Sequence, residues 1–571
     1  MAPMAQTRQR SAAPPAPHDH ADDRAPREHS GHRRLERAPS LVITAVILVL
    51  IASATVRLYQ VQRPHVLVFD EIYYAKDAHT ILHGYLGPEP MYPWEPGNEV
   101  SWPHPEYGKL AIAAGEVPFG YTSFGWRIVP VIAGTILLAL VYPLGRRLGL
   151  SPVWALLGLI LAASDFLGIV QSRIATLDIF VGLWSVLCIY LALRYVQTGH
   201  RVRMLFLCGL AGGLALGTKW SGAYAILAAA AILALYRRPI GSLKERWRPL
   251  AVAGTFVVAG AVLIALGAHV PSRFVLIGLL FVLTGAVMFE VTIPSLRLPT
   301  LALVVLPAVL YFASYTVYFV KGHHTLGQWW ELQHQMWWFN ENLHATHTYM
   351  SKAWTWIIDY RPVWYYYEQA HDTVHGIISI GNPLLWWASL PALIALAVLA
   401  FLRRDKALVL LPLIVALLYL PWFPVSRTSF MYYMTPVAPF MALAVAMILR
   451  EISHARLPRL RWGLLCYGAA AAVAALLWYR IGHLVNWWFW QEPHHVSAAF
   501  AWVVLVVALG VVLFGIVALI LWPRSRGLWP YLTWLYAGGV TGICVAFLPI
   551  LIDLSISTTH FYQLMWFSNW I

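Results

Sequence analysis

Charged residues are scarce in this chain: only 12% of its 571 residues are Asp, Glu, Lys or Arg, whereas 59% are hydrophobic. A water-soluble protein of this length needs far more polar surface to cover its core. The hydrophobic residues gather in nearly uncharged runs, among them 41–58, 251–268, 499–521 and 540–551. Most runs approach the ~20 residues of a membrane-spanning helix, and none shows the strict alternation of a membrane β-barrel. We therefore predict an all-α polytopic membrane protein.

Several features that signal other protein classes are missing. The four cysteines lie inside hydrophobic runs, which favours small buried residues over disulfides or metal ligands. The chain has no Cys/His spacing typical of zinc and no Gly-rich nucleotide loop. No internal repeat of the transporter type is evident, so symmetry gives no support to a pump.

Acidic residues are fewer than basic ones, 26 against 40, which gives a net charge of +14. The basic residues recur in short gaps between every second hydrophobic run, for example at 146–147, 201–203, 403–406 and 524–526. This spacing is the positive-inside pattern, and it places those gaps in the cytoplasm. The excess charge is therefore a topological signal, and we expect no nucleic-acid partner.

The same pattern divides the chain. We predict a disordered cytoplasmic tail at 1–39, an N-terminal transmembrane module at 40–320 with a loop at 60–126, an aromatic loop at 321–383, and a C-terminal transmembrane module at 384–571. Both loops lie outside the cytoplasm, and we expect roughly 13 to 15 spans. An odd number of spans would leave the C-terminus outside as well.

Two adjacent carboxylates, Asp70 and Glu71, follow the first predicted span and precede a helical segment. They suit the positive end of a helix dipole. Ionisable residues beside a bilayer are, however, expensive and tend to be functional. A carboxylate placed there is able to act as a general base on an alcohol. Farther along the chain, Arg173 and Asp178 meet at another membrane boundary, either as a structural ion pair or as a phosphate ligand beside a second acidic group.

Several motifs occur in order along residues 41–571: Phe69-Asp70-Glu71-Ile72-Tyr73-Tyr74, His104-Pro105…Gly108-Lys109, Gln171-Ser172-Arg173…Asp178, Lys219-Trp220-Ser221-Gly222, Arg361-Pro362-Val363-Trp364, Arg427-Thr428-Ser429…Tyr432-Tyr433, and Met565-Trp566…Asn569-Trp570. Together they resemble the protein O-mannosyltransferase family, most closely its bacterial, actinobacterial-type branch. One departure is His104-Pro105-Glu106-Tyr107-Gly108-Lys109, where the family has His-Pro-Pro-Leu-Gly-Lys. The carbohydrate-binding-like module of eukaryotic members is absent.

The resemblance implies a GT-C-type glycosyltransferase, a cell-membrane fold with a core of roughly 11 spans. It also implies transfer of mannose from polyprenyl-phosphate mannose to Ser or Thr hydroxyls of exported proteins, by inverting displacement on the extracytoplasmic face. Asp70 would be the base, with Glu71 as its alternative or as a group that orients the acceptor. A phosphate leaving group needs cations, and the candidates on the outer face are Arg173, Arg427, Lys219 and Arg361, of which Arg173 and Arg427 are preferred. We expect supporting or acceptor contacts from His104, Lys109, Asp178, Trp220, Trp364, Tyr432 and Tyr433.

We expect no required cofactor, although Asp70, Glu71 and Asp178 together could hold a divalent cation. The expected partners are the donor lipid, the acceptor protein, the bilayer and the protein export machinery. One alternative keeps the donor but transfers the sugar to a glycolipid or a cell-wall glycan. A lipid or sugar transporter is a further alternative, which would require ionisable residues near the middle of the bilayer.

Overall fold

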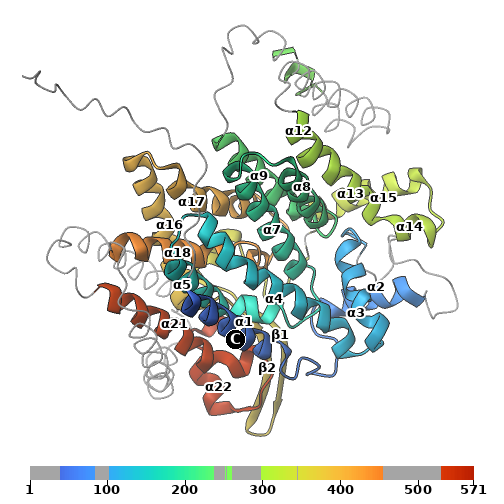
Figure 1. The fold of residues 1–571 in the computed structure, drawn as a ribbon. Helices are drawn as coiled ribbons and strands as arrows, with labels where there is room; N and C mark the ends of the chain where they lie inside the picture. The colour runs from blue at the N-terminus through green and yellow to red at the C-terminus, as the bar shows by residue number, and fades with distance from the viewer. Residues whose placement is uncertain are drawn as a thin grey trace, which may run out of the picture.

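The computed structural model describes residues 39–83, 102–236, 251–252, 254–256, 258–259, 297–343, 345–453 and 529–571. These residues are mostly helical (Figure 1). The first half comprises α1 (Ser40–Leu58), α2 (Glu71–His83), α3 (Tyr107–Phe119), α4 (Ser123–Arg147), α5 (Pro152–Ala163), α6 (Phe166–Gln171), α7 (Asp178–Gln197), α8 (Val202–Leu216), η1 (Trp220–Gly222), α9 (Ala223–Leu235), α12 (Arg297–Thr300), η3 (Leu301–Val305), α13 (Leu306–Ser314) and α14 (Thr316–Val320).

The second half adds the only strands among the described residues. It comprises α15 (Leu326–Asn342), η4 (Ala353–Ile358), β1 (Val363–Ala370), β2 (Thr373–Ser379), α16 (Pro383–Arg403), α17 (Lys406–Tyr419), η5 (Leu420–Trp422), η6 (Met431–Met434), α18 (Ala438–Ser453), α21 (Trp529–Leu551), β3 (Ile556–Ser557), α22 (Thr558–Leu564) and η8 (Ser568–Trp570).

Six described helical segments are long and apolar enough to cross a membrane: Ser40–Leu58, Ser123–Arg147, Asp178–Gln197, Arg297–Ser314, Pro383–Arg403 and Tyr531–Leu551. Four shorter apolar helices accompany them, at Pro152–Ala163, Val202–Leu216, Trp220–Leu235 and Lys406–Trp422. The predicted tail, up to residue 38, and the hydrophobic segments at about 271–292 and 463–522 lie outside the described residues. The helical, membrane-embedded fold class is confirmed, and the total number of spans stays a prediction.

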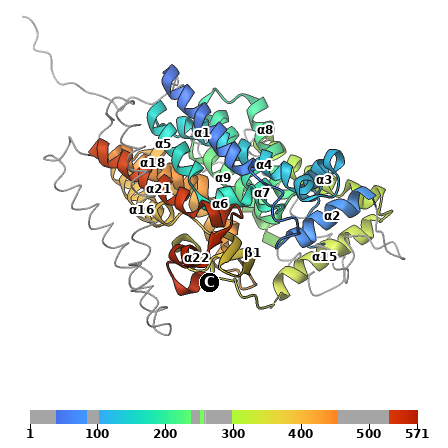
Figure 2. The same ribbon diagram turned by 90° about the horizontal axis from the view of Figure 1, so that it is seen from below.

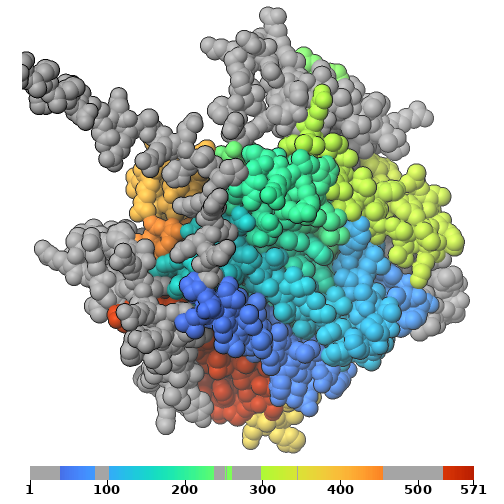
Figure 3. Space-filling model, in the orientation of Figure 1, coloured from blue at the N-terminus to red at the C-terminus, as the bar shows by residue number. Residues whose placement is uncertain are grey.

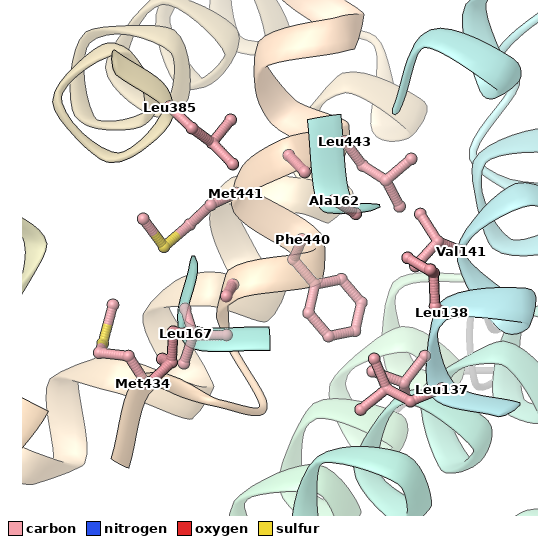
Figure 4. Close-up of a cluster of buried hydrophobic side chains, with 14 of the residues drawn as sticks. Leu137, Leu138, Val141, Ala162, Leu167, Leu385, Met434, Phe440, Met441 and Leu443 are labelled. Carbon is pink, nitrogen blue, oxygen red and sulfur yellow. The ribbon is translucent and has the colours of Figure 1, made fainter. Parts of the chain in front are cut away.

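The core forms where α4, α5, α7 and α18 pack together, so the predicted N-terminal and C-terminal modules share one interior. Leu138, Phe440 and Leu443 meet there, each at most 2% exposed (Figure 4). Glycines let the helices approach: a Cβ at Gly158 would lie 2.7 Å from Cδ2 of Leu443. Close approach at small residues is how helices associate in a membrane, where lipid is as apolar as the side chains.

The predicted aromatic loop, 321–383, holds a β-hairpin, which the all-α prediction missed. β1 pairs antiparallel with β2, and the C-terminal β3 adds to the other side of β2. The run Val363–Tyr367 consists of β-branched and aromatic residues, which favour strands. A strand of eight residues is too short to be distinguished from the surrounding sequence by the hydrophobic pattern that predicts helices.

The predicted loop at 60–126 contains the helices α2 and α3, which lie beside α15 at one end of the molecule (Figure 2). A small second core joins them. Its buried members are Ile81, Tyr315, Tyr318, Leu332 and Met336. Both predicted loops are thus folded against each other and are able to frame a site.

Candidate active site

Asp70 lies at the start of α2, in a segment with an unusual backbone. The preceding residue, Phe69, has φ of 48°, in the left-handed region that non-glycine residues rarely adopt. Its ring stacks on Tyr365 of β1, with the centroids 4.6 Å apart. The Tyr432 hydroxyl donates to Oδ2 of Asp70 at 3.2 Å. Asp70 keeps part of its side chain exposed, so it is held from two sides and still open to a substrate.

Beside Asp70 lies a buried ion pair between Lys219 and Asp178. The Lys219 ammonium donates to both Asp178 oxygens at 3.1 Å, and the two residues are 4% and 3% exposed. The ammonium also lies over the face of Tyr433, 4.2 Å from the ring centroid. Aromatic faces attract cations, and the attraction grows when water is excluded. Two of the predicted supporting residues therefore hold a cation close to the carboxylate of Asp70.

Burial raises the pKa of Asp70 to about 7. The neighbouring Lys219 cation lowers that pKa, the Asp178 carboxylate raises it, and the hydrogen bond from Tyr432 lowers it. A carboxyl with a pKa near neutrality exists in both protonation states at physiological pH. This is the range in which a general base takes up a proton and releases it again most effectively.

Glu71 points away from this site and forms a saturated network with Arg127 of α4. Both residues are fully buried. The guanidinium donates at 2.8 and 2.7 Å to the two Glu71 oxygens, and at 3.1, 2.9 and 2.9 Å to the carbonyls of Val61, Pro64 and Val66. Glu71 accepts two more bonds, from the backbone N–H groups of Val68 at 3.0 Å and Ala175 at 2.9 Å.

All five Arg127 donors and four acceptor positions of Glu71 are thus used within the protein. The pair ties the segment after α1 to α4 and to the loop before α7. Arg127 was not among the site residues predicted from the sequence. A sign of its role was present in the sequence: Arg127 is a single charged residue near the start of a long apolar helix. A charged residue is costly there unless it has a partner.

His104 and Arg427 lie close to the same charges. Burial, together with the cations Lys219, Arg427 and Lys109, lowers the pKa of His104 well below its usual value, so the imidazole is neutral. The Arg427 guanidinium also acts electrostatically on Asp178. In the described part of the chain, its one hydrogen bond is a long one of 3.5 Å to the carbonyl of Thr428. Of the predicted phosphate ligands, Arg427 is the most weakly engaged.

The other predicted cations have different partners. Arg173 is 3% exposed, and one of its terminal nitrogens lies 2.8, 2.8 and 2.9 Å from the carbonyls of Val56, Arg57 and Tyr59, where it caps α1. Arg361 donates to Thr348, Asn569 and Ile571 carbonyls and so ties the C-terminal segment to the second loop. Both guanidinium groups are therefore engaged by main-chain carbonyls, not presented beside Asp70.

Three predicted supporting residues, Lys109, Trp220 and Trp364, bind partners other than Asp70. Lys109 is fully buried, with its ammonium 3.1 Å from Asp77 and 3.3 Å from Glu106. Glu106, which departs from the family motif, thus supplies a counter-charge. Trp220 donates to the Tyr311 hydroxyl at 2.8 Å, and Trp364 to the Trp570 carbonyl at 2.7 Å.

No group of three His, Cys, Asp or Glu side chains within the described ranges is arranged to hold a metal ion. Of the three carboxylates considered for a cation, Glu71 already accepts from four N–H groups and Asp178 binds Lys219 with both oxygens.

Comparisons with known proteins give the fold a context. Residues 46–321 match the family model described as dolichyl-phosphate-mannose-protein mannosyltransferase. A polyprenol-phosphate-mannose–protein mannosyltransferase of Mycolicibacterium smegmatis is 28% identical over 483 residues, which cover 74% of this chain and 84% of the relative. The protein of the same name from Corynebacterium glutamicum is 26% identical over 447 residues, 67% of this chain and 77% of the relative.

Among solved structures, the S. cerevisiae protein O-mannosyltransferase Pmt1-Pmt2 complex bound to the sugar donor has a similar fold. Its TM-score is 0.59, at 12% sequence identity, and the match covers 94% of this chain and 93% of that chain. At this identity the likeness concerns the fold.

Proposed function

We propose, from the premise that this chain belongs to the protein O-mannosyltransferase family through its domain at residues 46–321, that it transfers mannose from polyprenyl-phosphate mannose to Ser or Thr hydroxyls of proteins. The observation that carries the proposal is Asp70. It is a partly exposed carboxyl with a pKa of about 7, which accepts a hydrogen bond from Tyr432 and lies near the Lys219 cation. The relatives named above supply the identity of donor and acceptor.

In the proposed reaction, Asp70 takes the proton from the acceptor hydroxyl while the hydroxyl oxygen attacks the anomeric carbon of the mannose. The bond between that carbon and the phosphate oxygen breaks, and the configuration inverts because no sugar–enzyme bond forms. The leaving group is a polyprenyl phosphate. Its negative charge is met by Arg427 and by the ammonium of Lys219. Water then takes the proton from Asp70.

Glu71 and Arg173 have positioning roles in this proposal. Glu71, through Arg127, fixes the segment that carries Asp70, and Arg173 fixes the end of α1 that leads into it. No metal ion takes part. In this proposal Lys219, which acts on Asp70, and Arg427, which acts on Asp178, meet the charge of the monophosphate leaving group, because Arg and Lys bind phosphate oxygens directly.

The reaction centre belongs, in this proposal, to the extracytoplasmic face of the cell membrane. The support is the grouping of basic helix ends at the other end of the bundle. Arg450 of α18 donates to the Gly149 carbonyl after α4 at 3.0 Å, and Gln197 of α7 donates to Arg147 at 2.7 Å. Asp178 begins α7, whereas Gln197 ends it. The positive-inside pattern assigns the basic ends to the cytoplasm, so Asp178 and Asp70 face outward.

The proposal is tested by supplying the purified chain in lipid nanodiscs with polyprenyl-phosphate mannose and a Ser/Thr-rich peptide. Mass spectrometry should detect one added hexose on a Ser or Thr of the peptide, and Asp70→Asn should abolish the addition without loss of folded protein. A glycolipid and a cell-wall glycan fragment are offered in parallel. Labelling of either of these acceptors with no sugar on the peptide would overturn the assignment of a protein acceptor.

A further inference from the structure

The hairpin formed by β1 and β2 has a free edge. In the three-stranded sheet the order is β1-β2-β3, so β1 is the outer strand and no described strand pairs with its other side. Residues 367–373 at the outer end are exposed. The hairpin projects beyond the helices in Figure 1, and its tip (yellow) protrudes below the C-terminal segment (red) in Figure 3. An edge of this kind presents unpaired N–H and C=O groups to any chain that approaches.

The register identifies which main-chain groups face outward. Ala370 and Thr373 are partners on either side of the two-residue turn His371–Asp372. In an antiparallel pair that closes with such a turn, hydrogen-bonded and non-hydrogen-bonded pairs alternate from the closing pair onward. The main-chain N–H and C=O groups of Ala370 and Glu368 therefore face β2. Those of Tyr367 and Gln369 point to the open side of the sheet.

A bulge connects this edge with the reaction centre. The register of β1 shifts between Trp364 and Tyr366, so Tyr365 is the extra residue. Bulges next to active sites re-aim side chains. Here the Tyr365 ring stacks on Phe69, and Gln171 donates to its hydroxyl at 2.6 Å. Phe69 immediately precedes Asp70. The open main-chain groups of Tyr367 thus begin two residues, or about 7 Å of strand, from the residue that contacts the Asp70 segment.

We propose that the free edge of β1 binds the acceptor polypeptide as an added, extended strand, and that this strand delivers its Ser or Thr to Asp70. The inference rests on the proposed function. Strand addition suits an acceptor that is still unfolded, because main-chain hydrogen bonds supply affinity without requiring one particular sequence. Tyr366 and Tyr367 flank the edge and add aromatic surface for alternate side chains of the bound strand.

The test uses Gln369, whose side chain is exposed and accepts one hydrogen bond, from the Tyr367 hydroxyl. Gln369→Pro removes an outward N–H, and proline is tolerated where the N–H of an edge strand faces solvent. Gln369→Thr is the matched control, because it keeps the main-chain donor. Both variants of the full chain in nanodiscs are assayed with a Ser/Thr peptide of roughly 12 residues, long enough to pair with the edge, and with N-acetyl-threonine methylamide, which is too short.

For the long peptide we expect Gln369→Pro to raise KM about tenfold, because the variant loses one or two hydrogen bonds to the peptide and its ring blocks the edge. Gln369→Thr should match the wild-type chain. The short acceptor should show no difference among the three proteins. A long peptide with one N-methylated residue near its Thr should lose its advantage over the short acceptor with the wild-type chain and with Gln369→Thr, whereas Gln369→Pro should treat the methylated and unmethylated long peptides alike.

Equal KM values of Gln369→Pro and wild type for the long peptide would overturn the docking proposal and leave the mannosyl transfer intact. A change in oligomeric state by light scattering with unchanged kinetics would overturn it too, since the edge would then pair with a second copy of the chain. No transfer by the wild-type chain to either acceptor would overturn the proposed function and the docking proposal with it.

Discussion

The Tyr432 hydroxyl donates a 3.2 Å hydrogen bond to Asp70 across 362 positions of sequence. This contact joins the segment after the first transmembrane helix to the η6 turn before α18. A hydrogen bond to a carboxylate favours its charged form. Tyr432 thus counteracts the burial of Asp70, as the Lys219 cation does, and helps to set the pH at which the carboxylate becomes a base.

The first prediction concerns the pH dependence of transfer. Asp70 has a pKa of about 7, raised by burial from its ordinary value. A base must be ionised, so the single-turnover rate should fall about tenfold per pH unit below 7 and level off above it. Single-turnover rates between pH 5.5 and 9, with a saturating donor, measure this. A rate that is flat from pH 5.5 to 7 would remove Asp70 from the role of base.

The second prediction isolates the Tyr432 contact. Tyr432→Phe removes the hydrogen bond that lowers the pKa of Asp70 and preserves the packing of the ring against Phe430, with centroids 5.3 Å apart. The midpoint of the pH–rate profile should move upward by up to about one unit, and the rate above that midpoint should recover. A uniform loss at every pH would show that Tyr432 contributes to something other than the ionisation of Asp70.

The third prediction uses the ion pair beneath Asp70. Lys219 lowers the pKa of Asp70 and Asp178 raises it. Lys219→Met should therefore move the midpoint of the pH–rate profile upward, and Asp178→Asn should move it downward. Each single change also leaves a buried charge without its partner, so both should lower the melting temperature.

The double variant Lys219→Met with Asp178→Asn supplies the control. It should recover part of the lost melting temperature, because no unpaired charge from this pair remains, while its pH midpoint lies between those of the single variants. Shifts of the same sign in both single variants would contradict the electrostatic account of Asp70.

The sequence singled out most residues of this candidate site but not their partners, and the difference has a physical reason. The hydrophobic run 41–58 was predicted to span the membrane and corresponds to α1, Ser40–Leu58, because hydrophobic length is a property of one uninterrupted segment. Asp70 was recognised because it is an acidic residue at a membrane boundary. Both features are local, so sequence alone reveals them.

Pairing is not local. Arg173 and Arg427 are the same residue type at similar boundaries, and only the fold shows that one binds the carbonyls at the end of α1 and the other lies near Asp178. In the same way, Glu71 follows Asp70 directly, yet the helical turn at the start of α2 aims one carboxylate at Arg127 and the other at Tyr432. The motifs named candidate residues without separating those whose contacts suit a positioning role from those that lie beside Asp70.

The fourth prediction separates the two kinds of arginine. Arg427→Ala should lower the transfer rate about 100-fold, since it removes a cation from the leaving phosphate, and Arg427→Lys should recover part of that loss. Arg203→Ala, an exposed cation at the start of α8, serves as the matched control and should behave as wild type. Michaelis constants for the donor and single-turnover rates measure the effect. Wild-type rates in Arg427→Ala would exclude this residue from phosphate binding.

The last prediction addresses how Asp70 is held in position. Arg127 makes five hydrogen bonds in a fully buried site, two of them to Glu71. Lysine has no planar fork and only three donors, so Arg127→Lys leaves carbonyls and a carboxylate oxygen unsatisfied. We expect it to cost about 3–5 kcal/mol of stability, which is seen as a lower melting temperature.

The kinetic signature of Arg127→Lys distinguishes positioning from phosphate binding. A loosened Asp70 segment should lower the transfer rate with both long and short acceptors, because misplacement of a base affects every proton transfer. The donor KM should stay near the wild-type value, since Arg127 donates to five acceptors within the protein and has no donor left for a phosphate. A donor KM that rises as steeply as in Arg427→Ala would mean that the Glu71–Arg127 network opens during the reaction and that Arg127 reaches the lipid phosphate itself.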